Sequence, residues 1–192
     1  MENTAIKVGF AICGSFCTFS KVIPQIKLIA DAGYDVLPIM SETAYSTDTR
    51  FGKAKEFRQE IEDICEKKIL HTIAEVEPIG PKKMTDIMII APCTGNTLSK
   101  LANSTIDTAV TMAAKSHLRG QRPLLIALST NDGLTGSAQN MGALLNRKNV
   151  YFVPMAQDDP LQKPASLVAH FNLIVPAMES ALMGQQIQPF FR

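Results

Sequence analysis

The stretch Ile87-Met-Ile-Ile-Ala-Pro-Cys-Thr-Gly-Asn-Thr-Leu-Ser-Lys100 decides the fold of this chain. Its first part, residues 87–91, is wholly apolar, which indicates a strand buried on both faces. Such strands belong to parallel sheets that are covered by helices. Pro92 cannot donate to a strand ladder, so the strand is predicted to end there. A polar loop follows, and the apolar Leu98 and Leu101 then share one face of a predicted helix.

The polar loop, residues 94–97, lies between the carboxyl end of this strand and the N-terminus of the helix. In open α/β sheets, ligands bind at this position. Helix N-termini favour anionic groups, phosphate above all. From this stretch alone, an ordinary N-capped turn without a ligand is an equally good interpretation.

Short apolar runs alternate with helical patterns along the rest of the chain. The sequence shows no internal repeat, no low-complexity tract and no linker between domains. This alternation predicts a single α/β domain over residues 1–192, a doubly wound and mostly parallel sheet with helices on both faces. The C-terminal part, about residues 163–184, is predicted to form a helical tail that Pro176 interrupts.

Two further strand ends carry small polar residues. Gly14 and Ser15 follow the first predicted strand, and Ser129-Thr130-Asn131 follows the strand at 123–128. Glycine lets the backbone approach a ligand closely, and hydroxyl groups and amides can hold a phosphate. The first turn is not GxGxxG, and Ser41 stands after the second strand where a dinucleotide site needs an acidic residue. The sequence therefore favours a mononucleotide or another phosphate.

Composition excludes several classes of protein. The chain has 192 residues and a net charge of +1, which gives no electrostatic argument for binding to nucleic acid or to an anionic membrane. Its four cysteines include no CxxC pair, and no histidine stands at metal-ligand spacing, so no metal site is expected. No apolar run approaches membrane-spanning length, and the N-terminus lacks a signal pattern. We expect a soluble cytoplasmic protein with reduced thiols.

The histidines and one cysteine are the first candidates for chemistry. His71 falls in a possible edge strand, His117 near a helix end where partial charge suits the dipole, and His170 in the predicted tail helix. None lies in a predicted strand-end loop, so each is interpreted as structural. Cys93 precedes a helix N-terminus, which can lower a thiol pKa. It is either a nucleophile or a small residue that fills a tight turn.

No pair of carboxylates stands out for acid–base catalysis. Lys100 and Asp107 are predicted to form a pair that is either structural or orients a ligand. Because the side chains offer little chemistry of their own, the pattern indicates that a cofactor supplies it.

These residues also carry a family resemblance. Residues 91–97 with Lys100, Ala102 and Asp107 resemble the signature A-P-x-[ST]-x-N-T-x-x-K-x-A-x-x-x-x-D of the flavoprotein family, which includes the flavin-containing cysteine decarboxylases. Gly14 and Ser15 match the phosphate turn that this family has after its first strand. The resemblance covers nearly the whole chain. It implies FMN as the cofactor.

The resemblance also implies which residues form the site. Gly14, Ser15 and Ser41 are expected on the phosphate and ribityl side, and Thr94, Asn96 and Thr97 along the flavin. The full expected cofactor-binding set is Gly14, Ser15, Phe16, Ser41, Cys93, Thr94, Asn96, Thr97 and Ser129. The expected catalytic residues are Thr130 and Asn131, which with Ser129 face the carboxylates of a substrate.

Several segments resemble one branch of this family, a bacterial oxidoreductase subunit. They are residues 9–18, 22–25, 130–134, 152–160, 163–164 and 186–189. This resemblance implies a partner chain that binds NAD(P) and a small cyclic dicarboxylate as substrate. It also implies a homo-oligomer, a trimer or a multiple of one, in which a neighbouring chain completes the flavin site.

Two departures from the decarboxylases leave alternatives open. The decarboxylases carry a catalytic histidine shortly before the position of Asp86, where this chain has Glu77-Pro78. They also carry P-A-M-N where this chain has Leu128-Ser-Thr-Asn131. One alternative is a stand-alone FMN-dependent decarboxylase for another carboxylate. The other is a non-catalytic subunit that stabilises a partner enzyme.

Overall fold

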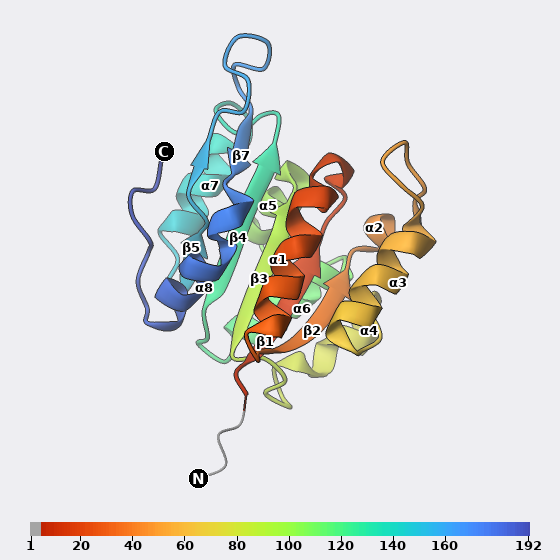
Figure 1. Ribbon diagram of the computed structural model, residues 1–192. Helices are drawn as coiled ribbons and strands as arrows, with labels where there is room; N and C mark the ends of the chain where they lie inside the picture. The colour runs from red at the N-terminus through yellow and green to blue at the C-terminus, as the bar shows by residue number, and fades with distance from the viewer. Residues whose placement is uncertain (1–4) are drawn as a thin grey trace.

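The computed structural model describes residues 5–192, which form a seven-stranded sheet with helices on both faces (Figure 1). The strands are β1 (Lys7–Ile12), β2 (Asp35–Met40), β3 (Ile87–Cys93), β4 (Leu124–Thr130), β5 (Val150–Phe152), β6 (Met155–Ala156) and β7 (Leu167–Ala169). Their order is β2-β1-β3-β4-β7-β6, with β5 also paired to β4. All pairs among β1 to β5 are parallel, so the predicted fold class is confirmed.

The last two strands of the sheet, β7 and β6, are joined to it by antiparallel pairs. β5 pairs in parallel with residues 124–126 of β4. β7 pairs antiparallel with Ser129 and Thr130, at the carboxyl end of β4. β6 then pairs antiparallel with β7. The loop between β6 and β7 projects beyond the carboxyl ends of the central strands (Figure 1).

Helices connect the strands, as the apolar periodicity predicts. The helices are α1 (Phe19–Asp31), α2 (Glu42–Ser46), α3 (Ala54–Cys65), α4 (Ile73–Val76), α5 (Gly95–Ala102), α6 (Ala109–Leu118), α7 (Ala138–Leu145) and α8 (Ile174–Leu182). Single 3-10 turns occupy Phe16–Thr18, Glu77–Ile79 and Phe171–Leu173. Among the described residues, no helix is both long enough and apolar enough to cross a membrane.

The sheet separates two hydrophobic cores. Alternate side chains of a strand point to opposite faces. Phe10 and Ile89 accordingly pack with α1, α3 and α8, while Ala11 and Ile90 pack with α5, α6 and α7. Every residue of β3 is buried, which explains why its sequence is a continuous apolar run rather than an alternating one.

The end of β3 differs from the prediction. The strand does not stop at Ala91 but continues through Pro92 to Cys93, and the register with β4 shifts between Ile90 and Cys93. Proline is accepted at such an irregularity because no ladder donor is required of it there. Its carbonyl still accepts from the backbone N–H of Cys13 at 3.2 Å, which joins β3 to the turn after β1.

The predicted helical tail is only partly correct. Residues 167–169 form β7 instead, because Leu167 and Ala169 are buried against the sheet. The helix itself covers only Ile174–Leu182. Pro176 does not divide it, since this proline lies in the first turn, where backbone N–H groups have no partner within the helix.

Candidate functional site

Three strand-end segments meet at the carboxyl edge of the sheet. The order β2-β1-β3-β4 reverses direction between β1 and β3, and ligands bind at such a topological switch point. Ser15 after β1 and Ser129 at the end of β4 lie 3.0 Å apart, Oγ to Oγ. Thr97 in α5 donates to the sulfur of Cys13 at 3.3 Å. The predicted convergence of these segments is therefore a feature of the structure.

A cleft of about 470 Å³ opens where these segments meet. Its volume falls within the roughly 300–1,000 Å³ that is usual for small-molecule sites. The predicted site residues that line it are Gly14, Ser15, Thr94, Ser129, Thr130 and Asn131. The other lining residues are Cys17, Thr18, Lys21, Gly95, Asp158, Lys163 and Val168.

Five residues predicted for the site lie outside this lining set: Phe16, Ser41, Cys93, Asn96 and Thr97. The ring of Phe16 packs on Phe19, with their centroids 5.3 Å apart. Ser41 begins α2 as its N-cap and accepts from the N–H of Ala44. Thr97 is buried and supports the cleft from behind through Cys13.

Of the two interpretations of Cys93, the nucleophile requires a lowered thiol pKa, and the structure shows the opposite. The Cys93 side chain is fully buried, and burial raises its thiol pKa well above the usual value. Burial likewise raises the pKa of the Cys13 thiol to about 11. Both thiols therefore stay protonated at neutral pH. Cys93 is accordingly interpreted as a small residue that fills a tight turn.

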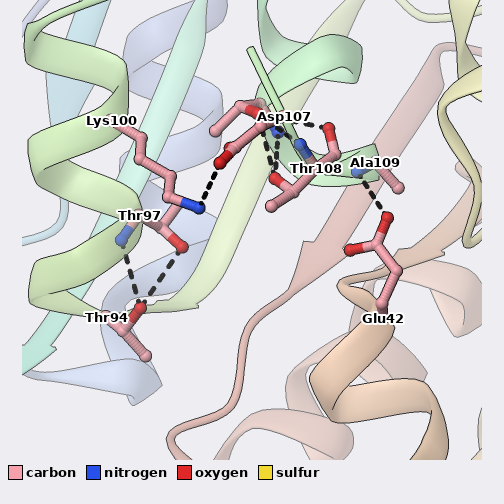
Figure 2. A network of polar contacts seen from close by, with 8 residues as sticks. Glu42, Thr94, Thr97, Lys100, Asp107, Thr108 and Ala109 are labelled. Carbon is pink, nitrogen blue, oxygen red and sulfur yellow. Dashed lines mark hydrogen bonds and ion pairs between the residues drawn. The ribbon is translucent and has the colours of Figure 1, made fainter. Parts of the chain in front are cut away.

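The N-terminus of α5 presents unused hydrogen-bond donors beside the cleft. Thr94 is the N-cap, and its hydroxyl oxygen accepts from the N–H of Thr97 at 3.3 Å (Figure 2). Within residues 5–192, no hydrogen bond uses the backbone N–H groups of Gly95 or Asn96. These two N–H groups and the positive end of the helix dipole suit an anion.

Gly95 also lets α5 approach the loop after β4. A Cβ atom at this position would lie 2.5 Å from Oγ1 of Thr130 and 2.9 Å from Oγ of Ser137. Both hydroxyls donate to the carboxylate of Asp132. These hydrogen bonds, of which the one from Thr130 has the larger effect, hold the pKa of Asp132 below its usual value. The close approach therefore depends on a residue without a side chain, and Asp132 fixes the loop in place.

Two basic residues at the cleft were not among the predicted site residues. Lys21 comes from the first turn of α1, and Lys163 from the loop between β6 and β7. Asp158 in the same loop lies 3.1 Å from the ammonium group of Lys163 and raises the pKa of that lysine. Nothing local in the sequence indicates that the loop containing Lys163 returns to the strand ends.

The predicted pair Lys100–Asp107 is present and structural. Figure 2 shows Lys100 reaching from α5 to the loop before α6, where its ammonium nitrogen lies 2.9 Å from Asp107. Glu42 at the start of α2 accepts from the backbone N–H of Ala109, the first residue of α6. These contacts tie α2, α5 and α6 together behind the cleft, and neither Lys100 nor Asp107 lines it.

No histidine is among the described residues that line the cleft. His71 stacks on Tyr45, with ring centroids 3.7 Å apart, and lies outside any strand. His117 is fully buried in α6, and burial lowers its pKa to about 4, so the expected partial charge is absent at neutral pH. His170 precedes the turn Phe171–Leu173 and is not helical. Among the described residues, no cluster of His, Cys, Asp and Glu could hold a metal ion.

The sheet order, with its switch point between β1 and β3, is that of the flavodoxin-like doubly wound folds. A model of the Flavoprotein family matches residues 1–169, and the chain belongs to this family.

Two relatives are similar to this chain over nearly its whole length. The chain is 44% identical over 183 residues to the B subunit of dipicolinate synthase from Bacillus subtilis (strain 168), a match that covers 95% of this chain and 92% of that protein. The crystal structure of the dipicolinate synthase B subunit from Bacillus halodurans C superposes with a TM-score of 0.91 at 41% identity, over 100% of this chain and 98% of that one.

A more distant structure shares the fold. The FMN-dependent cysteine decarboxylase SpaF superposes with a TM-score of 0.70 at 18% identity, over 93% of this chain and 95% of that one.

Proposed function

We propose that this chain is the B subunit of a dipicolinate synthase and binds FMN in the strand-end cleft. The observation that carries the proposal is the cleft itself, built from three strand ends in a chain 44% identical to a protein of that name. The proposed partner is the A subunit of dipicolinate synthase, which is expected to hold NAD(P). The proposed setting is the cytoplasm of the mother cell in a sporulating bacterium.

The residues of the cleft fit FMN chemically. The hydroxyls of Ser15 and Ser129 and the free N–H group of Gly95 are neutral donors in the cleft, the N–H group of Asn96 lies beside it, and Lys21 adds a positive charge. Such a set suits a phosphate and a chain of hydroxyl groups. The cleft volume of about 470 Å³ is within the range that is usual for a bound small molecule.

The proposed reaction is the oxidation of dihydrodipicolinate, or of its hydroxytetrahydro precursor, to dipicolinate. FMN supplies a two-electron acceptor when it is bound. Asn131 is exposed and its side chain makes no hydrogen bond within residues 5–192, so its amide is free to donate to a substrate carboxylate. The hydroxyl of Thr130 already donates to Asp132, which leaves Thr130 the smaller role of positioning the loop.

The first experiment measures the cofactor directly. The purified chain is expected to show a flavin absorption spectrum, or to acquire one when FMN is added, and to release FMN on denaturation as identified by mass spectrometry. A colourless chain that does not take up added FMN would exclude the flavin mechanism. The three strand-end segments would then be assigned to substrate or partner contact.

Asn131→Ala should lower turnover by roughly 10- to 100-fold, because a lost hydrogen bond to a charged group weakens the held carboxylate by about 1.5–3 kcal/mol. FMN content and the midpoint of thermal unfolding should stay unchanged, since the side chain is exposed. The measurement is steady-state oxidation with the partner chain present. Asn103→Ala makes the same change outside the cleft and should keep full activity. Unchanged turnover in the Asn131 variant would remove Asn131 from the site.

Two alternatives make different predictions. A stand-alone FMN-dependent decarboxylase would act on a carboxylate without any partner, although the cleft lining found within residues 5–192 contains no histidine. A non-catalytic role for this chain would leave its partner fully active in isolation. Assays of each of the two chains by itself and of the mixture distinguish the three.

We also propose a homo-oligomer, a trimer or a multiple of one, as in the family. The exposed side chain of Met183 after α8 and the surface around Ile106 before α6 are the proposed interface regions.

A further inference from the structure

Lys163 is the second positive charge in the strand-end cleft, and the fit to FMN does not use it. The described lining of the cleft contains two lysines, Lys21 and Lys163, and one carboxylate, that of Asp158. Lys21 lies in α1, just after the turn that is expected to hold a phosphate. Lys163 lies in the loop between β6 and β7, and within residues 5–192 its only ion-pair partner is Asp158 at 3.1 Å. The two lysines therefore reach the cleft from different segments and can serve different anions.

Hydrogen bonds fix the backbone of the loop around Lys163. Its N–H donates to the carbonyl of Asp159 at 2.8 Å, and its own carbonyl accepts from the N–H of Ser166 at 3.0 Å. The side-chain amide of Gln157 donates to the carbonyl of Pro164 at 2.8 Å. The side chain of Lys163 itself is exposed. The loop therefore presents an ammonium group from a fixed backbone, while the side chain remains free to change its partner.

The same loop is tied to the strand end that carries Asn131. β7 pairs with the carboxyl end of β4, and the hydroxyl of Ser166 donates to the carbonyl of Thr130 at 3.2 Å. Asn131 is the next residue along the chain. The amide of Asn131 and the ammonium group of Lys163 consequently line the cleft from two segments that are bound to each other. This arrangement suits a ligand with two anionic groups.

The ion pair with Asp158 makes Lys163 selective. The side chains of Lys163 and Asp158 are 53% and 34% exposed. Ion pairs with this exposure contribute little to stability, so an incoming carboxylate can take the place of Asp158 at small cost. A neutral group offers Lys163 no such exchange and leaves the pair intact.

We propose that Lys163 determines the specificity of the cleft for dicarboxylates. Asn131 holds one carboxylate of the ligand, and the second carboxylate replaces Asp158 on Lys163. The inference rests on the function proposed above and adds to it the residue that distinguishes two carboxylates from one.

Binding of dipicolinate and of picolinate, the same ring with one carboxylate, tests this role. Calorimetry on the full chain in a metal-free buffer, with and without added FMN, gives both affinities. The wild type should prefer dipicolinate by about tenfold, the contribution of one charge-assisted contact. Lys163→Met should lose this preference, because dipicolinate binding weakens and picolinate binding does not change. Lys163→Arg keeps the positive charge and should retain the preference.

Lys148→Met is the matched control, since Lys148 is exposed and lies outside the described lining of the cleft. It should bind both ligands like the wild type. Equal wild-type affinities for the two ligands, no dipicolinate binding with or without FMN, or a preference that survives in Lys163→Met would each overturn the proposal. So would a parallel loss of FMN uptake in Lys163→Met, which would assign Lys163 to the cofactor. Failure of the proposed flavin function is seen separately, as a wild type that takes up no FMN.

Discussion

Gly95→Ala should lower the affinity of the chain for FMN by about a hundredfold, which corresponds to about 2.7 kcal/mol. The added methyl group would lie 2.5 Å from Oγ1 of Thr130 and 3.0 Å from Oδ1 of Asp132. These side chains cannot swing away freely, because Thr130 and Ser137 both donate to Asp132. The N-terminus of α5 must therefore move from the end of β4, which separates two walls of the cleft.

Gly142→Ala is the matched control for this substitution. Gly142 lies within α7, and a Cβ atom there would meet no other heavy atom within 4 Å. This variant should bind FMN normally and gain about 0.5–1 kcal/mol in stability, because alanine favours the helix. Titration of the flavin spectrum and urea unfolding measure the two effects. Normal FMN affinity in Gly95→Ala would show that the close approach of α5 does not shape the site.

Acidification from pH 6.5 to pH 4 should destabilise the folded chain by about 3 kcal/mol through His117 alone. The Pro123 carbonyl can only accept, so Nε2 of His117 carries the proton and donates to it at 2.9 Å. Nδ1 then accepts from the hydroxyl of Thr85 at 2.8 Å. The neutral ring is thus fully paired in a site without water access.

Burial is the main reason that the folded-state pKa of His117 falls to about 4. The carbonyl of Pro123 opposes this shift, the positive charge of Arg122 adds to it, and Asp86 again opposes it. Between pH 6.5 and pH 4 the unfolded chain therefore binds more protons than the folded chain at this position. Stability consequently falls as the pH falls through this window, and the contribution is complete above pH 6.5.

The difference between wild type and His117→Gln isolates this effect. The amide of glutamine does not titrate in this range, and the carboxylates common to both proteins cancel in the comparison. Urea unfolding at several pH values should give a free-energy difference between the two proteins that shrinks by about 3 kcal/mol on acidification from pH 6.5 to pH 4. Parallel stability curves would show that His117 is protonated equally in both states.

The central sheet was predictable from the sequence because each strand carries its own signal. The run at 87–91 is too apolar to be exposed and too short for a helix between its polar neighbours, and it forms most of β3. The short strands β6 and β7 lack such a signal. Leu167 and Ala169 form a strand because β4 offers them a partner at its carboxyl end, which no local pattern reveals.

The candidate site was predictable in outline and not in detail. Parallel strands place their carboxyl ends on one edge, so the segments at 14–15, 94–97 and 129–131 had to meet there. Which side chains face the cleft depends on packing. Ser41 caps α2 and Thr97 supports the cleft from behind, while Lys163 arrives from a loop distant in sequence.

The sequence by itself determined the alternation of strands and helices and the edge at which polar residues gather. Apolar periodicity and turn chemistry are local properties of the sequence. The geometry of a parallel sheet then places the carboxyl ends of its strands on one edge. Only the tertiary structure decided the ionisation of Cys93 and His117 and the placement of Lys163 in the cleft. Burial and hydrogen bonding set these properties, and both arise from neighbours that are far apart along the chain.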